Sequence, residues 1–207
     1  MFFSFEGIDC CGKTTQIKLL ANKLTEAQRT VQLLREPGGT EISERIRTIL
    51  LDKKHLNMTQ ISELFLFSAA RAQLVSEVIK PALAQKTIVI CDRFVDSTTA
   101  YQGYGRGLTL GAVKTINTVA TFGILPKKTF LIDITIQEML DRRAASHQEV
   151  DRMELGNKEF FTRVRDGYLE MAEHEKDRFV VINGKQHIET IHEEIWRVVE
   201  NILPQLE

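Results

Sequence analysis

A glycine-rich loop near the start of the chain restricts the fold more than any other feature. Residues 7–14 read GIDCCGKT, with the spacing G-x-x-x-x-G-K-T, and they follow a short apolar run at residues 1–5. Glycines at both ends let backbone N–H groups turn inward around an anion, because no Cβ blocks the curl. Lys13 can reach β- and γ-phosphates, and the Thr14 hydroxyl can bind Mg²⁺. The motif predicts a strand, a phosphate-binding loop and a helix, with a nucleoside triphosphate as ligand; a structural glycine turn is the alternative.

The composition is that of a folded protein of ordinary polarity. The 207 residues fit one domain, and 43% of them are hydrophobic and 27% charged. A net charge of −1 argues against broad nucleic-acid binding, so we expect a small-molecule partner. The apolar stretches are too short to cross a bilayer, and the N-terminus enters the phosphate loop too early for a signal peptide. We therefore expect a cytoplasmic protein with no membrane partner.

Three cysteines form neither a C-x-x-C pair nor a disulfide framework. Cys10 and Cys11 lie inside the phosphate loop, and Cys91 lies in a later apolar run. A disulfide between the two neighbours is conceivable, but small filler residues in a reducing compartment fit the sequence better.

Apolar runs alternate with segments of helical periodicity along the whole chain. Ile17, Leu20, Ala21 and Leu24, for example, recur at the i, i+3, i+4, i+7 spacing of a helix. The predicted strands are residues 2–5, 31–34, 87–91, 129–134 and 179–182. The predicted helices are residues 16–27, a segment around 42–50, a long segment from residue 60 that stops before the helix breaker Pro81, and residues 111–122, 158–176 and 188–203.

Strands separated by helices imply βαβ units. We predict an α/β fold, with three αβα layers around a five-stranded parallel sheet, in a single domain over residues 1–207. Such a sheet binds ligands at the carboxyl ends of its strands. Polar clusters follow the first three predicted strands, at Asp9, Arg35-Glu36 and Asp92-Arg93. Residues 141–157 form the one long region with few apolar side chains, which suggests a mobile cover, or lid, over the site.

Asp92 and Arg93 come directly after the apolar run 88–91. A carboxylate at the tip of a strand can hold Mg²⁺ through water, and an adjacent arginine can bridge two phosphates. The alternative is a helix N-cap followed by a surface arginine. The phosphate loop favours the functional interpretation.

Phe67 and Arg71 lie four residues apart in a predicted helix, and therefore on one face. A ring and a guanidinium one turn apart can stack on a base and clamp a carbonyl or a phosphate. Taken alone, a phenylalanine more often lies in the core and an arginine on the surface.

Three further groups of residues suit a nucleotide. Residues 35–40 (REPGGT) form either a solvated loop or a glycine-rich wall beside the pocket. Residues 97–103 (STTAYQG) supply hydroxyls and an amide for a pyrimidine and a sugar, or else a polar helix surface. The predicted lid is bordered by Arg142, Arg143 and Arg152. An arginine that reaches the site when a lid closes can stabilise the phosphoryl group during transfer. The alternative is a solvated basic helix end.

Seven segments stand in the order of the motifs of a known family. They are F-E-G-x-D at 5–9, the phosphate loop, R-E-P-G-G-T at 35–40, F-x-A-x-R at 67–71, D-R-F at 92–94, S-x-x-A-Y-Q-G at 97–103 and D-R-x-E at 151–154. Over essentially its whole length the chain resembles the bacterial thymidylate kinases, which are P-loop nucleoside monophosphate kinases. The resemblance implies phosphorylation of dTMP to dTDP by ATP with Mg²⁺, a step in dTTP synthesis, and a homodimer.

The resemblance also assigns residues to the substrates. ATP would lie over Gly7, Ile8, Asp9, Cys10, Cys11, Gly12, Lys13, Thr14 and Thr15, with Mg²⁺ near Thr14, Asp92 and Asp9. The dTMP-binding residues would be Asp9, Glu36, Pro37, Arg47, Phe67, Arg71, Arg93, Ser97, Tyr101 and Gln102. In this set Phe67 would cover the base, Arg71 would read the thymine edge and Arg93 would bind the phosphate. The catalytic residues would be Lys13, Arg93, Arg142, Arg143 and Arg152.

The chain departs from the family in its arginines. Some family members act through an arginine within the phosphate loop, whereas this chain has Cys10 and Cys11, so the charge must come from the lid. Similar lids carry alternating arginines through to a glycine, but here the run stops after Arg142 and Arg143. We expect Arg142 to act on the transferring phosphoryl group slightly ahead of Arg143, with Arg152 third.

Two other functions would use similar motifs. A kinase for deoxynucleosides also has an acidic–arginine pair after a strand, but it needs a carboxylate to deprotonate a 5′-hydroxyl. A nucleotide-binding switch or regulatory ATPase is the other candidate. The sequence lacks the guanine-reading N-K-x-D signature, and Cys91-Asp92-Arg93 replaces the hydrophobic-D-E ending typical of ATPases.

Overall fold

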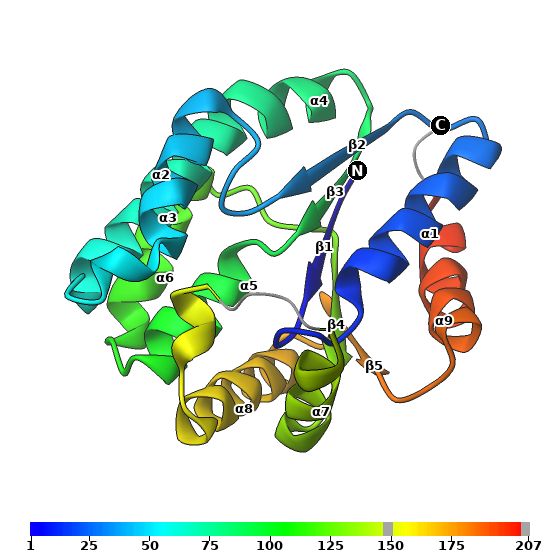
Figure 1. Cartoon of the computed structure of the whole chain (residues 1–207). Helices are drawn as coiled ribbons and strands as arrows, with labels where there is room; N and C mark the ends of the chain where they lie inside the picture. Colours follow the sequence, from blue (N-terminus) through cyan, green and yellow to red (C-terminus); the bar gives the residue numbers. More distant parts are fainter. Residues whose placement is uncertain (147–150, 204–207) are drawn as a thin grey trace.

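The computed structural model describes residues 1–146 and 151–203, and within these residues five parallel strands form one sheet (Figure 1). The order of the strands across the sheet is β2-β3-β1-β4-β5. The predicted five-stranded parallel sheet is confirmed, and each predicted strand end lies within one residue of the observed one. The strands are β1 (Phe2–Glu6), β2 (Val31–Arg35), β3 (Ile88–Asp92), β4 (Lys128–Asp133) and β5 (Phe179–Asn183).

Helices cover both faces of this sheet, so the predicted αβα layers are confirmed. Figure 1 shows α1 and α9 on one side of the sheet and α2, α3 and α6 on the other, and α1 packs directly on α9. The α-helices are α1 (Lys13–Glu26), α2 (Glu41–Leu51), α3 (Gln60–Leu74), α4 (Lys80–Ala84), α5 (Val95–Thr98), α6 (Leu110–Thr121), α7 (Ile136–Ser146), α8 (Lys158–His174) and α9 (Ile188–Glu200). Shorter elements are the 3₁₀ turns η1 (Lys53–His55) and η4 (Met153–Leu155) and the π-helical turns η2 (Val75–Ile79) and η3 (Thr99–Gly105).

Three predicted helix boundaries are wrong by three residues or more. The last predicted helix ends at Glu200 rather than at residue 203. The first helix begins at Lys13 rather than at residue 16, because its first turn is part of the phosphate loop. The long helical path from Gln60 does not stop before Pro81 but continues to Ala84. The helical path continues through the π-helical turn η2. Pro81 then lies in the first turn of α4, where the N–H that proline lacks is not needed for an intrahelical hydrogen bond.

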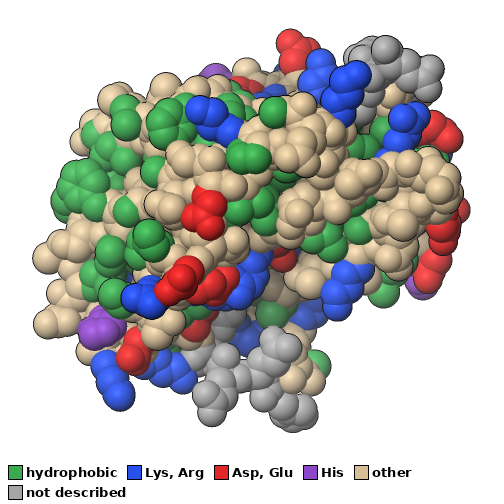
Figure 2. All heavy atoms as spheres, turned by 90° about the horizontal axis from the view of Figure 1, so that it is seen from above, with side chains coloured by type: hydrophobic (Ala, Val, Ile, Leu, Met, Phe, Trp, Pro, Cys, Tyr) green, Lys and Arg blue, Asp and Glu red, His purple; other side chains and the backbone are tan. Residues whose placement is uncertain are grey.

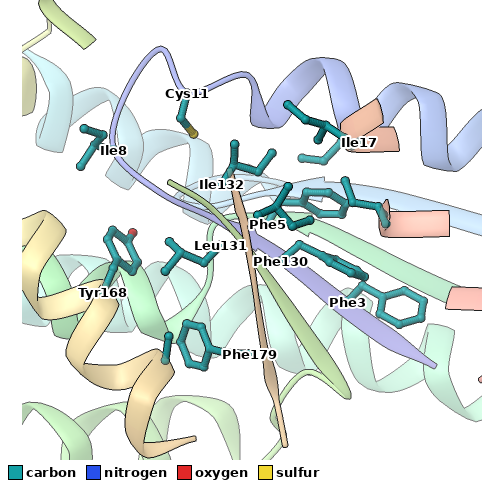
Figure 3. Close-up of a cluster of buried hydrophobic side chains, with 14 of the residues drawn as sticks. Phe3, Phe5, Ile8, Cys11, Ile17, Phe130, Leu131, Ile132, Tyr168 and Phe179 are labelled. Carbon is teal, nitrogen blue, oxygen red and sulfur yellow. The ribbon is translucent and has the colours of Figure 1, made fainter. Parts of the chain in front are cut away.

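The central position of β1 determines where the phosphate loop lies. Every residue of β1 is buried, and its neighbours are β3 and β4. The rings of Phe3 and Phe5 pack on Phe130 of β4, with centroid separations of 6.0 and 5.1 Å (Figure 3). In the register between β1 and β3, Phe5 lies opposite Asp92. The carboxyl end of β1 therefore presents the loop beside the end of β3, as the sequence predicted. Among the described residues, no helix is both long and apolar enough to span a membrane.

Candidate active site

The phosphate loop curls between β1 and α1. Gly7 has a φ of 135°, and a Cβ at this position would lie 2.5 Å from the carbonyl oxygen of Ile132, so only glycine fits. Lys13 is buried, and its Nζ donates to the carbonyl oxygens of Gly7 and Ile8 at 3.1 Å each. The ammonium thus lies inside the curl, where the β- and γ-phosphates of a nucleotide would be expected.

A cavity of about 440 Å³ opens over this loop, and we call it the donor pocket. Most of the predicted ATP-binding residues line it. Gly7 and Ile8 are the exceptions: these loop residues do not line the pocket, and Ile8 is part of the core. The lining residues are Asp9, Cys10, Cys11, Gly12, Lys13, Thr14, Thr15, Asp92, Arg93, Arg142 and Ser146.

The three cysteines all lie within the described residues, and none is in a disulfide. Cys10 lines the donor pocket, whereas the sulfur of Cys11 turns into the core beside Ile132 (Figure 3). Burial also raises the pKa of the Cys91 thiol well above its ordinary value. The disulfide between Cys10 and Cys11 that the sequence left open is not formed, and Cys11 is a buried filler residue.

Thr14 and Asp92 meet at the mouth of the donor pocket. The Thr14 hydroxyl donates to Asp92 Oδ2 at 3.0 Å. Mg²⁺ prefers hard oxygen ligands and is usually held by one or two protein oxygens together with phosphate oxygens and waters. This hydroxyl–carboxylate pair is therefore a donor set of the kind that Mg²⁺ accepts.

Two of the predicted lid arginines touch the phosphate loop. Arg142 donates from Nη1 to the carbonyl oxygens of Cys10 and Cys11, at 3.2 and 3.4 Å, and from Nη2 to Gly184 at 2.8 Å. Arg143 lies 3.9 Å from Asp9 Oδ2, and its guanidinium stacks over Phe161. Both arginines belong to α7, which extends into the predicted lid, whereas lid residues 147–150 lie outside the described part of the chain.

Arg152 lies elsewhere. It is buried, its Nε donates to the carbonyl oxygen of Leu50 at 2.6 Å, and its Nη1 donates to Glu63 Oε2 at 2.6 Å. Its chain neighbours Asp151 and Met153 line a second cavity. The structure thus brings Arg142 to the donor pocket and Arg143 to Asp9, and it places Arg152 beside the lining residues of the other pocket.

This second cavity has a volume of about 220 Å³, and we call it the acceptor pocket. All ten predicted dTMP-binding residues line it, so the structure brings that set together. The remaining lining residues are Leu51, Phe94, Thr98, Asp151 and Met153.

Arg71 is held rigidly in the wall of the acceptor pocket. The side chain is 2% exposed and donates to Glu36 Oε2 at 2.7 Å, Asn117 Oδ1 at 2.9 Å, the Phe94 carbonyl at 3.1 Å and Thr98 Oγ1 at 2.9 Å. A guanidinium has five N–H groups, so at most one remains for a ligand. Burial raises the pKa of Glu36, although the Arg71 charge opposes that shift. Arg71 is therefore neither a surface residue nor a solvated one.

Arg93 and Asp9 lie where the two pockets meet. Arg93 Nη2 donates to Asp9 Oδ1 at 2.5 Å, and its Nη1 donates to the carbonyl oxygen of Gly7 at 2.9 Å. Burial alone would raise the pKa of Asp9, but the charges of Arg93, Lys13 and Arg143 outweigh it and lower the pKa below its ordinary value. Asp9 is therefore a carboxylate, available to accept hydrogen bonds.

Comparison with known proteins identifies the family. The family model described as thymidylate kinase matches residues 5–195. A thymidylate kinase of Chlorobium luteolum is 50% identical over 200 residues, which are 93% of each chain. One of Thermoanaerobacter sp. (strain X514) is 46% identical over 202 residues, which are 98% of each chain. The crystal structure of thymidylate kinase from Ehrlichia chaffeensis matches with a TM-score of 0.78 at 39% identity, over 97% of this chain and 98% of that one.

The chain belongs to the thymidylate kinase family. It is therefore a phosphotransferase, and the resemblance read from the seven motifs is confirmed. The α/β fold read from the alternation of strands and helices agrees with the solved relative as well.

Several residues of the site were given no role from the sequence, although Glu6 and Thr98 stand within the motif segments 5–9 and 97–103. Glu6 and Tyr168 lie behind Arg93, Thr98 and Asn117 hold Arg71, and Glu63 holds Arg152. One signal did exist, because a glutamate at the end of a buried strand and before the loop glycine is unusual for a core position. The others carry no pattern that separates them from ordinary helix residues.

Proposed function

We propose that the chain transfers the γ-phosphoryl group of ATP to dTMP and releases dTDP and ADP, with ATP in the donor pocket and dTMP in the acceptor pocket. The observation that carries this assignment is that the two pockets share Asp9 and Arg93. A phosphate at the inner end of one pocket and a triphosphate in the other would meet at the same guanidinium. In-line transfer needs this adjacency.

The acceptor pocket suits a thymine base. Phe67 supplies a ring for stacking, and Arg71 can offer its remaining N–H to a carbonyl on the base edge. Tyr101 lies 3.3 Å from Asp9 Oδ2, so a hydroxyl and a carboxylate stand where the sugar would lie between base and phosphate. We assign the 3′-hydroxyl of the deoxyribose to Asp9.

Catalysis requires alignment and neutralisation of charge. The attacking phosphate oxygen of dTMP is already anionic, so no general base is needed. Lys13, Arg93 and Arg142 would stabilise the charge that spreads over the equatorial oxygens of the phosphoryl group. Thr14 and Asp92 would hold Mg²⁺, and the ion would supply positive charge against the β- and γ-phosphates. We assign residues 141–157 as the lid of this single-domain enzyme.

We further propose a homodimer and a cytoplasmic location. Large hydrophobic side chains are exposed on α2, on α3 and at the end of α6, and α3 packs against both of the other helices. Figure 2 shows hydrophobic side chains gathering on the left, the side that α2, α3 and α6 occupy in Figure 1. The side chains are Ile42, Ile49, Ile61, Phe65, Val119 and Phe122. Three thiols outside disulfides fit a reducing compartment.

A panel of acceptors tests the activity. ADP release should be measured with dTMP, dUMP, dCMP and thymidine, each with ATP and Mg²⁺. We expect the highest kcat/KM with dTMP. Turnover of thymidine at a similar kcat/KM would overturn the proposal in favour of a nucleoside kinase, and ADP release without any acceptor would favour an ATPase. Light scattering of the wild type and of Phe65→Glu tests the dimer, and a wild-type monomer would overturn it.

A further inference from the structure

Glu6 is a buried carboxylate at the end of β1, directly behind the site. Its side chain is inaccessible to solvent. Oε1 accepts a hydrogen bond from the Phe94 backbone N–H at 2.7 Å. Oε2 accepts from the Ser97 hydroxyl at 2.6 Å and from the Tyr168 hydroxyl at 2.9 Å. Figure 3 shows the Tyr168 ring reaching from α8 with its hydroxyl on the side of Ile8, near the end of β1. Both carboxylate oxygens are therefore engaged by donors.

The same two hydroxyls also contact Arg93. Arg93 Nη1 donates to Ser97 Oγ at 3.1 Å and to the Tyr168 oxygen at 3.3 Å, and the two hydroxyl oxygens lie 2.8 Å apart. Ser97 and Tyr168 thus stand between the carboxylate and the guanidinium. They come from α5 and α8, so three separate elements meet behind Arg93.

The chemistry of the outer groups gives this cluster a direction. Above the raised pKa of Glu6, which is about 7, its ionised carboxylate can only accept hydrogen bonds, and a guanidinium can only donate them. A hydroxyl between the two must point its proton toward Glu6 or the other hydroxyl and its lone pairs toward Arg93. Glu6 therefore holds the hydroxyl oxygens of Ser97 and Tyr168 in place as acceptors for Arg93 Nη1. The other terminal nitrogen of Arg93, Nη2, is bound to Asp9.

We propose that Glu6 is a positioning residue for phosphate binding, which acts on Arg93 through the hydroxyls of Ser97 and Tyr168. This inference rests on the proposed function, in which Arg93 binds the phosphate of dTMP. Ser97, taken from the sequence as a contact to the nucleotide, gains a second role as part of this link. With Nη1 held by these two hydroxyls and Nη2 by Asp9, the guanidinium keeps one orientation at the junction of the pockets, and little ordering remains to be done when the phosphate binds.

Glu6→Gln is a sharp test because the amide has nearly the same shape but the wrong polarity. The oxygen of glutamine can satisfy the Phe94 N–H or the hydroxyls, but not both. If the amide nitrogen faces the hydroxyls, they must accept from it and turn their protons toward Arg93. The variant therefore either reverses the link or sets its amide NH₂ against the Phe94 N–H, and it does so without opening a large cavity.

The measurement is calorimetric titration of wild type, Glu6→Gln and Arg93→Ala with dTMP and with thymidine, which lacks the phosphate. For Glu6→Gln we expect dTMP to bind about tenfold or more weakly, while thymidine changes less than about twofold, since only the phosphate contact depends on Arg93. The matched control is Asp133→Asn. It also converts a carboxylate that is bonded to an arginine into an amide, but its partner is Arg165, and Asp133 lines neither pocket. Its ratio of dTMP to thymidine affinity should stay at the wild-type value.

Each outcome decides one of the two proposals. Equal losses for dTMP and thymidine in Glu6→Gln, or no loss for either, would overturn the positioning role. If instead Arg93→Ala keeps the wild-type preference for dTMP over thymidine, the assignment of Arg93 to the phosphate fails first. Should Glu6→Gln not fold, Tyr168→Phe and Ser97→Ala remove one hydroxyl each. The positioning role then requires a selective loss of dTMP affinity in at least one of them, and its absence in both refutes it.

Discussion

Replacing Arg142 by alanine is the most informative perturbation of the donor side. The phosphate loop carries cysteines at positions 10 and 11, so any positive charge beyond that of Lys13 at the bond between the β- and γ-phosphates must come from outside the loop. Arg142 lines the donor pocket and already touches the loop through the carbonyl oxygens of Cys10 and Cys11. A shift of its side chain would exchange these carbonyls for phosphate oxygens.

The size of the effect follows from what Arg142 loses and gains. One charged donor aimed at a transition state contributes about 3–4 kcal/mol, or roughly 10²–10³ in kcat. Against this, the side chain must release its hydrogen bonds to Cys10, Cys11 and Gly184. Each is worth roughly 1–2 kcal/mol net, and part of that is regained from the phosphates. We therefore expect the lower end, a loss of about 10²-fold in kcat, with little change in the Kd of either substrate.

Arg143→Ala is the natural comparison because it removes the same charge one residue away. Its guanidinium lies over Phe161 and 3.9 Å from Asp9, so its loss should lower kcat by less than about tenfold. Coupled ADP release gives kcat, and titration with an ATP analogue gives Kd. A hundredfold loss in Arg143→Ala with near wild-type turnover in Arg142→Ala would exchange the two roles. Near wild-type rates in both, and in Arg152→Ala, would refute a lid arginine altogether.

Three more predictions follow from the same geometry. Lys13→Ala should lower kcat more than about tenfold while the affinity for dTMP stays within about twofold, because Lys13 lies inside the loop and away from the acceptor pocket. A kcat above a tenth of the wild-type value would contradict this prediction. Phe67→Ala should weaken dTMP binding by about 1–3 kcal/mol in calorimetry and leave ATP binding unchanged; equal dTMP affinity would return the ring to a packing role. Burial and the nearby Asp96 raise the pKa of Glu6 from 4.5 to about 7, although Ser97 and Arg93 oppose this shift. Between pH 4.5 and 7 the folded chain therefore binds more protons at Glu6 than the unfolded chain does. The contribution of Glu6 to the free energy of unfolding thus falls as the pH rises through this window. The Tm of Glu6→Gln relative to wild type should therefore rise between about pH 4.5 and 7, and a constant difference would refute the shift.

The sequence predicted the layout of the fold because local patterns determine it. A phosphate loop has to follow a strand and open a helix, and buried parallel strands read as short apolar runs, so β1 to β5 were found to within one residue. The rule that ligands bind at the carboxyl ends of parallel strands then brought Asp9 and Arg93 together, although they lie 84 residues apart.

Contacts that depend on tertiary packing could not be predicted in the same way. Tyr168 reaches Glu6 across 162 positions of the chain, and its place on α8 looks like that of any core aromatic residue. The π-helical turn η2 before Pro81 has no local signature either, since it only shifts the hydrogen-bond register within a helix. Arg152 was grouped with the lid arginines because it lies near them in sequence, whereas packing turns it toward Glu63.

The charges around the acceptor pocket explain why the donor side needs arginines of its own. Among the described lining residues, Asp9, Glu36 and Asp151 balance Arg47, Arg71 and Arg93. A pocket balanced in this way avoids repulsion among its arginines before substrate binds, but it holds no excess positive charge to offset a phosphate dianion. The compensating charge must come from the donor side, where Lys13 and Arg142 line the pocket and Arg143 lies 3.9 Å from Asp9. Carboxylates such as Glu6 and Glu36 therefore orient the acceptor arginines from behind, whereas the excess positive charge that drives transfer lies on the donor side.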